Sequence, residues 1–165
     1  GLLKAKEVIA QTENQFYEIF GRRYTGLTES YRTQDADYIL ITLGSIAGLV
    51  KETVDRLREA GKKVGLLRLR FLRPFPNQEI AQAVKNAKGI AVLEKDVSFG
   101  NEGTVYTNVN SALQKAGISS PSSNYIGGLG GKNISSDEIE NIYDELERGQ
   151  AAIRFIGIGG EAEWA

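Results

Sequence analysis

The sequence predicts a three-layer α/β domain, in which an open, mainly parallel sheet lies between two layers of helices and a helical arm precedes it. The first observation is that short apolar runs alternate with longer amphipathic segments from residue 37 to about residue 150, which is typical of βαβ units. The second is that these runs look apolar throughout, as expected for strands buried on both faces. Right-handed crossovers between such strands would place helices on both faces of the sheet.

Residues 2–20 carry apolar side chains near helical spacing, and Gly21 follows as a stop, so the arm is expected to be one helix. Residues 21–37 are rich in polar side chains and glycine and show no clear period, which predicts an irregular connector. The expected organisation is therefore an arm and connector at residues 1–36, an α/β domain at 37–150 and a tail at 151–165.

Within the α/β domain, four apolar runs predict strands and four amphipathic segments predict helices. The expected strands span residues 38–44, 63–71, 89–95 and 123–129. The expected helices span residues 46–61, 77–87, 101–117 and 135–149. Ser135 or Ser136 is expected to cap the last helix, whose acidic first turn suits the helix dipole. The tail is too rich in glycine to be assigned a structure, and two alternatives stay open: it adds a strand to the sheet, or it docks elsewhere.

The composition excludes several kinds of function. The net charge is −1 and no large cluster of Lys and Arg is present, which argues against nucleic acid or a membrane surface as a partner. No apolar run approaches the ~20 residues of a membrane helix. The absence of Cys and His excludes thiolate or imidazole catalysis, the usual zinc sites and iron–sulfur ligation, and fits a reducing compartment such as the cytoplasm. The sequence contains no Met, so it could be processed, trimmed or a piece of a longer protein.

Parallel sheets bind ligands at the carboxyl ends of their strands, so the loops after the expected strands are candidate sites. Residues 42–48, TLGSIAG, faintly resemble a phosphate-binding turn, with Gly44 and Ser45 as weak candidates for cofactor binding. The spacing matches neither GxGxxG nor GxxxxGK[ST]. The favoured reading is that Gly44 permits a tight turn and Ser45 caps the next helix.

The segment YIGGLGG, residues 125–131, is dense in glycine and forms the second weak candidate for cofactor binding. Such a loop can bring backbone N–H groups close to an anion or another chain, or it can serve only as a turn, and neither alternative is favoured. Its glycines are Gly127, Gly128, Gly130 and Gly131.

Glu94 is expected at the end of the third strand, where a buried carboxylate could have a role. The favoured alternative is a solvated or salt-bridged loop acid. Gly100 and Gly103 in the same loop are expected to shape the turn and to allow close packing of the following helix.

The segment Arg73-Pro74-Phe75-Pro76 lies between the second strand and its helix. Pro74 has no N–H group and is expected to end the strand, whereas Pro76 suits the start of the next helix. Arg73 could pair with a carboxylate across a domain or subunit boundary, but a local surface ion pair is slightly favoured. No nucleophile lies beside a base and no metal cluster is evident, so no catalytic or metal-binding residue is predicted.

Three segments of the sequence together resemble a known family. Residues 20–76, which begin FGRRYTG and end RPFP, are similar to the later part of the alpha chain of pyruvate:ferredoxin oxidoreductases. EKDVSFGNEG at residues 94–103 and YIGGLGGKNISSDEI at 125–139 follow in the family's order. The resemblance implies the fold of the C-terminal domain of transketolases.

The resemblance also implies an activity for the complete enzyme. That enzyme decarboxylates a 2-oxo acid on thiamine diphosphate, transfers the acyl group to coenzyme A, and reduces ferredoxin through iron–sulfur clusters. Pyruvate is the expected substrate, and 2-oxoglutarate or a branched 2-oxo acid is the alternative. Thiamine diphosphate, Mg and the clusters are expected on other domains or subunits, so this chain alone should bind no cofactor and be inactive.

Under the same resemblance, the role of the chain is architectural, in the assembly of a cytoplasmic enzyme of anaerobic metabolism. The arm would connect to, or lie along, a neighbouring domain. Other domains or subunits would be its partners, and the complete complex would also meet ferredoxin and coenzyme A. An independent module that binds a nucleotide or coenzyme A through the glycine loops remains an alternative. The expected interface residues are Arg22, Tyr24, Arg73, Pro74, Phe75, Pro76 and Glu94.

Overall fold

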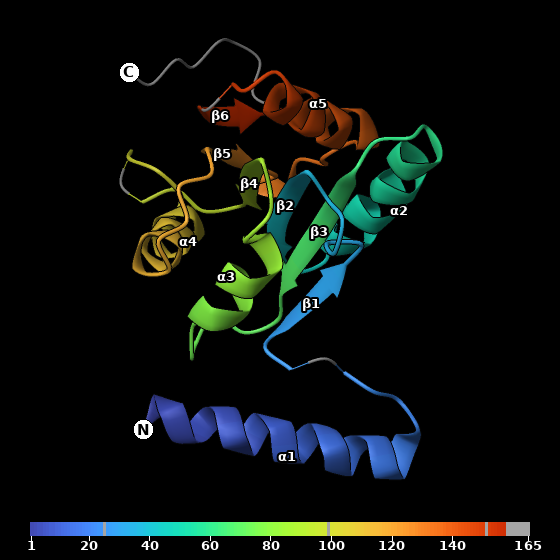
Figure 1. The fold of residues 1–165 in the computed structure, drawn as a ribbon, viewed down its shortest axis with the longest axis vertical. Coiled ribbons are helices and arrows are strands. Elements are labelled where there is room, and N and C mark those ends of the chain that lie inside the picture. Colours follow the sequence, from blue (N-terminus) through green and yellow to red (C-terminus); the bar gives the residue numbers. More distant parts are fainter. Residues whose placement is uncertain (25, 99, 151, 158–165) are drawn as a thin grey trace.

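The computed structural model describes residues 1–24, 26–98, 100–150 and 152–157. Within them, six strands form one sheet in the order β1-β3-β2-β4-β5-β6, in which all neighbours are parallel except β1 and β3 (Figure 1). The strands are β1 (Thr28–Tyr31), β2 (Tyr38–Leu43), β3 (Val64–Leu69), β4 (Gly89–Glu94), β5 (Ser122–Gly127) and β6 (Ile153–Ile156). The helices are α1 (Leu2–Phe20), α2 (Ile46–Glu59), α3 (Asn77–Val84), α4 (Thr104–Lys115) and α5 (Ser136–Glu147), with a 3₁₀ turn at Leu129–Gly131.

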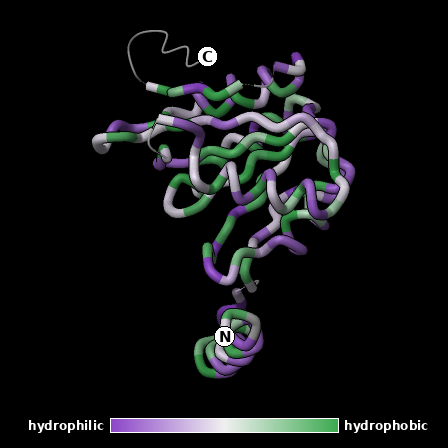
Figure 2. The backbone as a smooth tube through the Cα atoms, turned by 90° about the vertical axis from the view of Figure 1, so that its left-hand side faces the viewer, coloured by the Kyte–Doolittle hydropathy of each residue, from purple (hydrophilic) through white to green (hydrophobic). Residues whose placement is uncertain are grey.

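Two hydrophobic cores, one on each face of the sheet, produce the three layers. On β2, Leu40 points toward the core beneath α2 and α5, whereas Ile39 and Ile41 point toward the core beneath α3 and α4. This alternation explains why the central strands are apolar at nearly every position. Figure 2 shows the apolar segments of the backbone gathered inside the body, with α1 seen end-on and apart from it. The expected three-layer α/β fold with an N-terminal helix is confirmed.

The order of the strands creates a crevice at the carboxyl end of the sheet. From β2 the chain passes through α2 to β3 on one side, whereas from β4 it passes through α4 to β5 on the other. The loops that follow β2 and β4 therefore leave in opposite directions. Such a topological switch point is where open parallel sheets bind their ligands.

Two strands differ from the sequence-based expectation. β1 lies inside residues 21–37, which we expected to be irregular, and pairs antiparallel with β3 at the sheet edge. Its four residues, TESY, lack an apolar pattern because β1 is an edge strand with a partner on one side only, and only Thr28 of the four is buried. β6 in the tail pairs with β5, so the tail adds a strand to the sheet, which was one of the two alternatives left open by the sequence. Residues 158–165 of the tail lie outside the described residues.

The expectation that Pro74 ends a strand is wrong. β3 ends at Leu69, five residues earlier, where it pairs with Thr28 of β1 and Leu43 of β2. Leu43 is the last residue of its strand and Thr28 is the first of the antiparallel β1, so β3 loses both neighbours at the same level. Pro76 directly precedes α3, as expected, and its carbonyl accepts from Ile80 N at 2.9 Å.

The expected serine caps have different outcomes. Ser135 caps α5 through a capping box, in which its Oγ accepts from Glu138 N and the Glu138 carboxylate accepts from Ser135 N. Ser45 precedes α2, but its side chain makes no capping hydrogen bond, so that expectation is wrong. The reason is its helical backbone (φ −71°, ψ −28°), because a capping side chain needs an extended backbone such as that of Ser135 (φ −88°, ψ 163°).

A pair of serine substitutions tests this difference. We expect Ser135→Ala to lower the free energy of unfolding by about 1 kcal/mol, because a capping hydrogen bond is lost. Ser45→Ala is the matched control and should cost clearly less. Urea denaturation of both variants measures the costs, and equal losses would contradict the capping geometry.

Candidate functional site

A cavity of about 590 Å³ opens at the switch point between the carboxyl ends of β2 and β4. Its walls are mainly apolar, and charged side chains stand at its rim. Its lining is Thr42, Leu43, Gly44, Ser45, Ile46, Leu72, Arg73, Leu93, Glu94, Lys95, Asp96, Thr104, Val105, Asn108 and Ile134. A cavity of this size and character is typical of a small-molecule site.

A smaller hollow of about 220 Å³ adjoins this cavity, because both are lined by Ser45, Ile46, Lys95 and Ile134. Its remaining lining includes Gly131 and Lys132. The structure thus brings the Gly44-Ser45 turn and the end of the glycine-rich loop to one place. The other glycines of that loop, Gly127, Gly128 and Gly130, do not line either hollow.

Close packing explains two of these glycines. A Cβ at Gly127 would lie 2.4 Å from Ile156 Cγ1, because β6 pairs closely with β5 there. At Gly128, where φ is +74°, a Cβ would lie 2.8 Å from Lys95 Cε. The space beside both residues is therefore filled by the chain itself.

Glu94 is a buried carboxylate that holds the start of α4. Only 3% of the residue is exposed. Its carboxylate accepts from Val105 N at 2.7 Å, Tyr106 N at 3.0 Å and Asn124 Nδ2 at 3.0 Å. Asn124 Oδ1 in turn accepts from Gly103 N at 2.7 Å. The expectation of a solvated or salt-bridged loop acid is wrong, because Glu94 ends β4 and satisfies the free N–H groups of the helix.

Burial raises the pKa of the Glu94 carboxyl above its usual value near 4.5, and the three hydrogen bonds offset this rise only in part. The nearby Asp96 carboxylate raises the pKa further. The charged form of Glu94 is therefore held at a cost in the folded chain.

Arg73 lies at the exposed tip of the loop between β3 and α3, where it lines the cavity. It donates to Leu72 O at 2.6 Å, and its guanidinium lies 5.8 Å from the ring centroid of Phe75. No ion pair to Arg73 forms within the described ranges, so the favoured local surface ion pair is not found there. Pro74 and Pro76 are buried, and Phe75 packs partly against the core beneath α3 and α4.

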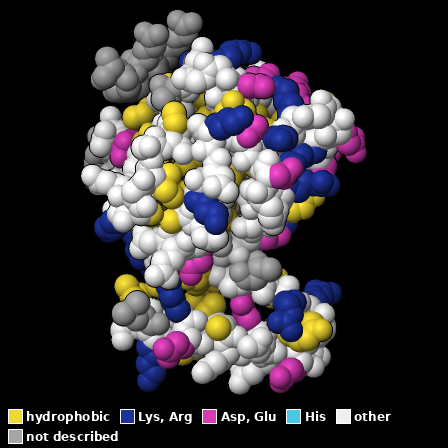
Figure 3. Space-filling view, viewed as in Figure 1, with side chains coloured by type: hydrophobic (Ala, Val, Ile, Leu, Met, Phe, Trp, Pro, Cys, Tyr) yellow, Lys and Arg dark blue, Asp and Glu magenta, His cyan; other side chains and the backbone are white. Residues whose placement is uncertain are grey.

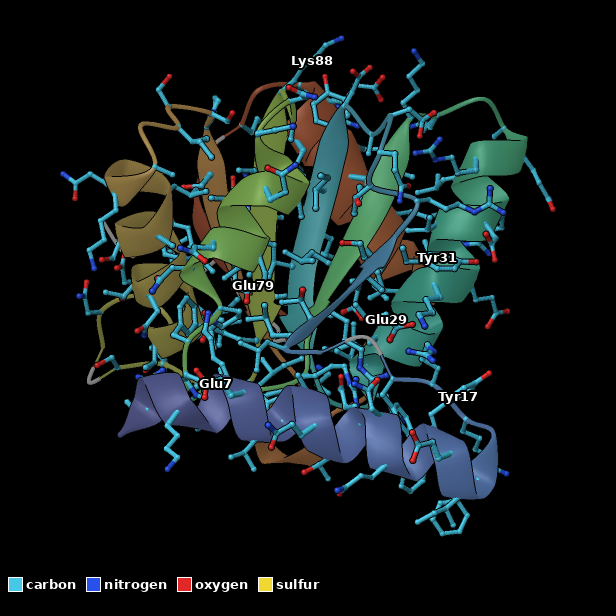
Figure 4. The ribbon with its side chains drawn as sticks, turned by 60° about the horizontal axis from the view of Figure 1, so that its bottom comes forward. Glu7, Tyr17, Glu29, Tyr31, Glu79 and Lys88 are labelled. Atoms are coloured by element: carbon cyan, nitrogen blue, oxygen red, sulfur yellow. The ribbon has the colours of Figure 1, made fainter. Side chains whose placement is uncertain are left out.

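The arm lies across the carboxyl end of the sheet, opposite the end marked by Lys88 (Figure 4). Glu13 on α1 joins it to the body, because its carboxylate pairs with Arg70 at 3.1 Å and accepts from Gly26 N. Lys6 pairs with Glu79 of α3 at 3.2 Å. These polar contacts leave much of the arm's apolar surface uncovered.

The expected interface residues Arg22 and Tyr24 follow α1 directly. The Tyr24 ring contacts Phe16 in a tilted arrangement, at 5.5 Å between ring centroids, and the Arg70 guanidinium lies 4.6 Å from the centroid of the Tyr24 ring. Arg22 is exposed. These contacts fix Tyr24 at the junction of arm and body, while the interface roles of both residues stay predictions.

Sequence reasoning missed three residues of this region, namely Lys95, Lys132 and Asn124. Asn124 offered a signal, because it is an amide directly before the apolar residues Tyr125 and Ile126 of a strand expected to be buried. Lys95 directly follows a strand end, and Lys132 directly follows the glycine-rich loop. In the part of the chain that the structure describes, no group of His, Cys, Asp and Glu could hold a metal ion. No helix in those ranges is long and apolar enough to cross a membrane.

Two glycine substitutions test the packing around Glu94. A Cβ at Gly103 would lie 2.0 Å from Glu94 Oε1, so Gly103→Ala should lower the free energy of unfolding by about 1–3 kcal/mol. Gly48→Ala is the control, because nothing lies within 4 Å of its added Cβ and alanine favours the helix by up to about 1 kcal/mol. Chemical denaturation should show opposite signs, and a neutral Gly103→Ala would contradict the packing.

The raised pKa of Glu94 predicts a specific pH dependence. A raised folded-state pKa favours folding below the usual value near 4.5, and this contribution is lost as the pH rises through the folded-state pKa. Relative to Glu94→Gln, the free energy of unfolding of the wild type should therefore fall as the pH rises above about 4.5. Urea denaturation from pH 4 to pH 7 measures the difference, and a flat or rising difference would refute the shift.

Comparisons with known proteins agree with the resemblance of the sequence. Residues 36–139 match the family "Pyruvate:ferredoxin oxidoreductase core domain II". The pyruvate synthase subunit PorA of Methanothermobacter thermautotrophicus is 39% identical over 160 residues, which are 97% of this chain and 40% of the relative. The ketoisovalerate oxidoreductase subunit VorA of Pyrococcus horikoshii is 39% identical over 161 residues, which are 98% of this chain and 40% of the relative.

Among solved structures, a 2-oxoglutarate:ferredoxin oxidoreductase from Magnetococcus marinus shares the fold, with a TM-score of 0.54 and 22% identity. The match covers 79% of this chain and 21% of that one. The chain spans about two-fifths of the length of the curated relatives. With most of the domain from the first core strand to α5 matched by the family, the chain belongs to the pyruvate:ferredoxin oxidoreductase core domain II family.

Proposed function

We propose that the chain is the assembly domain of a thiamine-diphosphate-dependent 2-oxoacid:ferredoxin oxidoreductase. The observation that carries this proposal is the arm, which presents large apolar side chains that the rest of the described chain does not cover. The family match supports the kind of enzyme. The complete enzyme would form acyl-CoA and CO₂ and reduce ferredoxin, while other domains or subunits hold thiamine diphosphate, Mg and the iron–sulfur clusters.

The exposed side chains of α1 argue for a covered surface in the complete protein. Ile19 is 73% exposed, Phe20 61% and Leu2 60%, and Val8 and Tyr17 are exposed on the same helix. In the space-filling view the arm is a separate lobe on which apolar side chains are visible (Figure 3). Three of them, Tyr17, Ile19 and Phe20, lie in the last turn of α1, and exposed apolar side chains that adjoin in this way are typical of protein interfaces. A neighbouring domain or subunit that covers α1 would remove them from water.

The loop tip at Arg73 is the second part of the proposed interface, together with Arg22 and Tyr24. The buried Pro74 and Pro76 hold the tip firmly, and the Arg73 guanidinium is free of described carboxylates to pair with a partner's acid. Glu94 would act indirectly, because its buried carboxylate fixes α4 beside the tip rather than facing a partner.

Pyruvate is the proposed substrate of the complete enzyme, because a pyruvate synthase subunit is among the similar relatives. A branched 2-oxo acid is the second candidate, because the ketoisovalerate oxidoreductase subunit is also 39% identical to this chain. Ferredoxin and coenzyme A as partners of that enzyme, and a cytoplasmic location, belong to the same proposal.

Assembly tests the proposal. The tagged protein, in its natural length and purified from source cells, should retain chains with a thiamine-diphosphate motif and Cys-rich chains. Ile19→Ser and Arg73→Ala should each reduce recovery of these chains, about tenfold for Ile19→Ser, because burial of a large apolar side chain stabilises by about 1.5–3 kcal/mol.

Gln15→Ser, at an exposed polar position of the same helix, is the control and should leave recovery unchanged. Full recovery with both test variants would refute an interface at the arm and the loop tip. Retention of no such chains by the wild type would refute the assembly role itself.

A further inference from the structure

Cations surround the two adjoining hollows at the switch point. Arg73 and Lys95 line the larger cavity, and Lys95 and Lys132 line the smaller hollow. In the described ranges, none of these three side chains has a carboxylate within 4.0 Å. By contrast, Lys62, Arg58 and Arg70 each pair with an acid. The positive charge at the hollows therefore remains available.

Two acids also face the larger cavity, and neither cancels this charge. The Glu94 carboxylate is buried and already accepts three hydrogen bonds. Asp96 is exposed at the rim and is the one acid there without such partners among the described residues. A third acid, Glu138, lies near Lys132, but its carboxylate accepts hydrogen bonds from Ser135 N and Ser135 Oγ and forms no ion pair with Lys132 within the described ranges. Arg73, Lys95 and Lys132 outnumber Asp96 and Glu138 around the connected hollows.

The two lysines are exposed, and each stem lies against a glycine backbone. Lys95 lies against the backbone of Gly128, between the larger cavity and the glycine-rich loop. The stem of Lys132 lies beside Gly157, where an added Cβ would be 3.2 Å from its Cδ. The first residue of α2, Ile46, lines both hollows, and no acid lies in the first turn of that helix. The positive end of the helix adds to the field of the lysines.

The apolar walls of the cavity indicate the chemistry of the rest of the ligand. Leu43, Leu72, Leu93 and Val105 give the larger cavity an apolar surface, and Ile46 and Ile134 stand where it meets the smaller hollow. A ligand that fits has an apolar body for the cavity and an anionic group for the lysines. A purely polar anion would leave the apolar walls unfilled, and a neutral apolar molecule would leave the cations without a partner.

We propose that the switch-point crevice binds a small organic anion, with its apolar body between β2 and β4 and its phosphate or carboxylate group between Lys95 and Lys132. This site is separate from the apolar assembly surface on α1, and its anion lies between Lys95 and Lys132, whereas Arg73 at the cavity rim also belongs to the proposed interface at the loop tip. Its failure would leave the assembly role intact.

Titration of the ¹⁵N-labelled chain with octyl phosphate and with octanoate tests the proposal by NMR. Either ligand should bind saturably and shift the amide signals of Gly44, Ser45 and Gly131. Tighter binding of octyl phosphate indicates a phosphate ligand, and tighter binding of octanoate indicates a carboxylate. The matched neutral probe, 1-octanol, and inorganic phosphate should each bind at least tenfold more weakly than the better anion.

Substitutions test which lysines bind the anionic group and whether the apolar wall binds the body of the ligand. Lys95→Gln and Lys132→Gln should each weaken binding of the better anion about tenfold, as expected for a charge-assisted contact. Leu72→Ser, at the exposed edge of the cavity, should weaken it through the apolar body. Lys115→Gln, in the last turn of α4, is the control and should have no effect.

Three outcomes would overturn the site. They are the absence of saturable binding, equal affinity for 1-octanol, and unchanged affinity in both lysine variants. Amide shifts on α1 in place of Gly44 and Gly131 would assign the anion to another surface and would also refute the proposal.

Discussion

The hydrogen bonds of Glu94 determine the geometry of the carboxyl end of the sheet. Glu94 ends β4, Asn124 lies in β5, and both bind the backbone at the start of α4. Thr42 Oγ1 of β2 donates to Leu93 O of β4 at 2.7 Å, one residue before Glu94. Three strands and a helix are thus joined by buried polar groups at the switch point. Such fully satisfied buried groups are costly to rearrange, so the crevice between β2 and β4 has a fixed shape.

Much of the fold could be predicted from the sequence, because the local hydrophobic patterns of the central strands and the helices indicate which of their faces are buried. Residues of β2 alternate between two cores, and the apolar faces of α2 and α5 recur at helical spacing. The capping box at Ser135 is equally local. The features that differed depend on partners distant in the chain. β1 is a strand only because β3 lies beside it, and β3 ends where both of its neighbours stop pairing with it.

In the candidate site, too, local features could be predicted from the sequence and contacts between distant residues could not. The rule that ligand loops gather at the carboxyl ends of parallel strands correctly brings the Gly44-Ser45 turn near the glycine-rich loop. The sequence left a buried Glu94 as the less favoured alternative, because its partner Asn124 lies 30 residues away and gives no local signal of the hydrogen bond. Lys95 and Lys132 give no pattern in the sequence, since their arrangement depends on how β4 and β5 place their following loops.

The arm and the body have different proposed roles, because they are packed differently. The body is a fixed scaffold with two packed cores, whereas α1 is held mainly by polar contacts at Glu13 and Lys6. Packing of α1 against other parts of a larger enzyme is the proposal, and the family match supports it.

Cross-linking with mass spectrometry on the complex purified from source cells tests the assembly role most directly. Lys4 lies exposed on α1, and Lys115 lies exposed on α4. If α1 is an assembly surface, Lys4 should cross-link to residues outside these 165, on domains or subunits that carry the thiamine-diphosphate site. Cross-links from Lys4 only to this chain, with external cross-links confined to Lys115, would contradict that role.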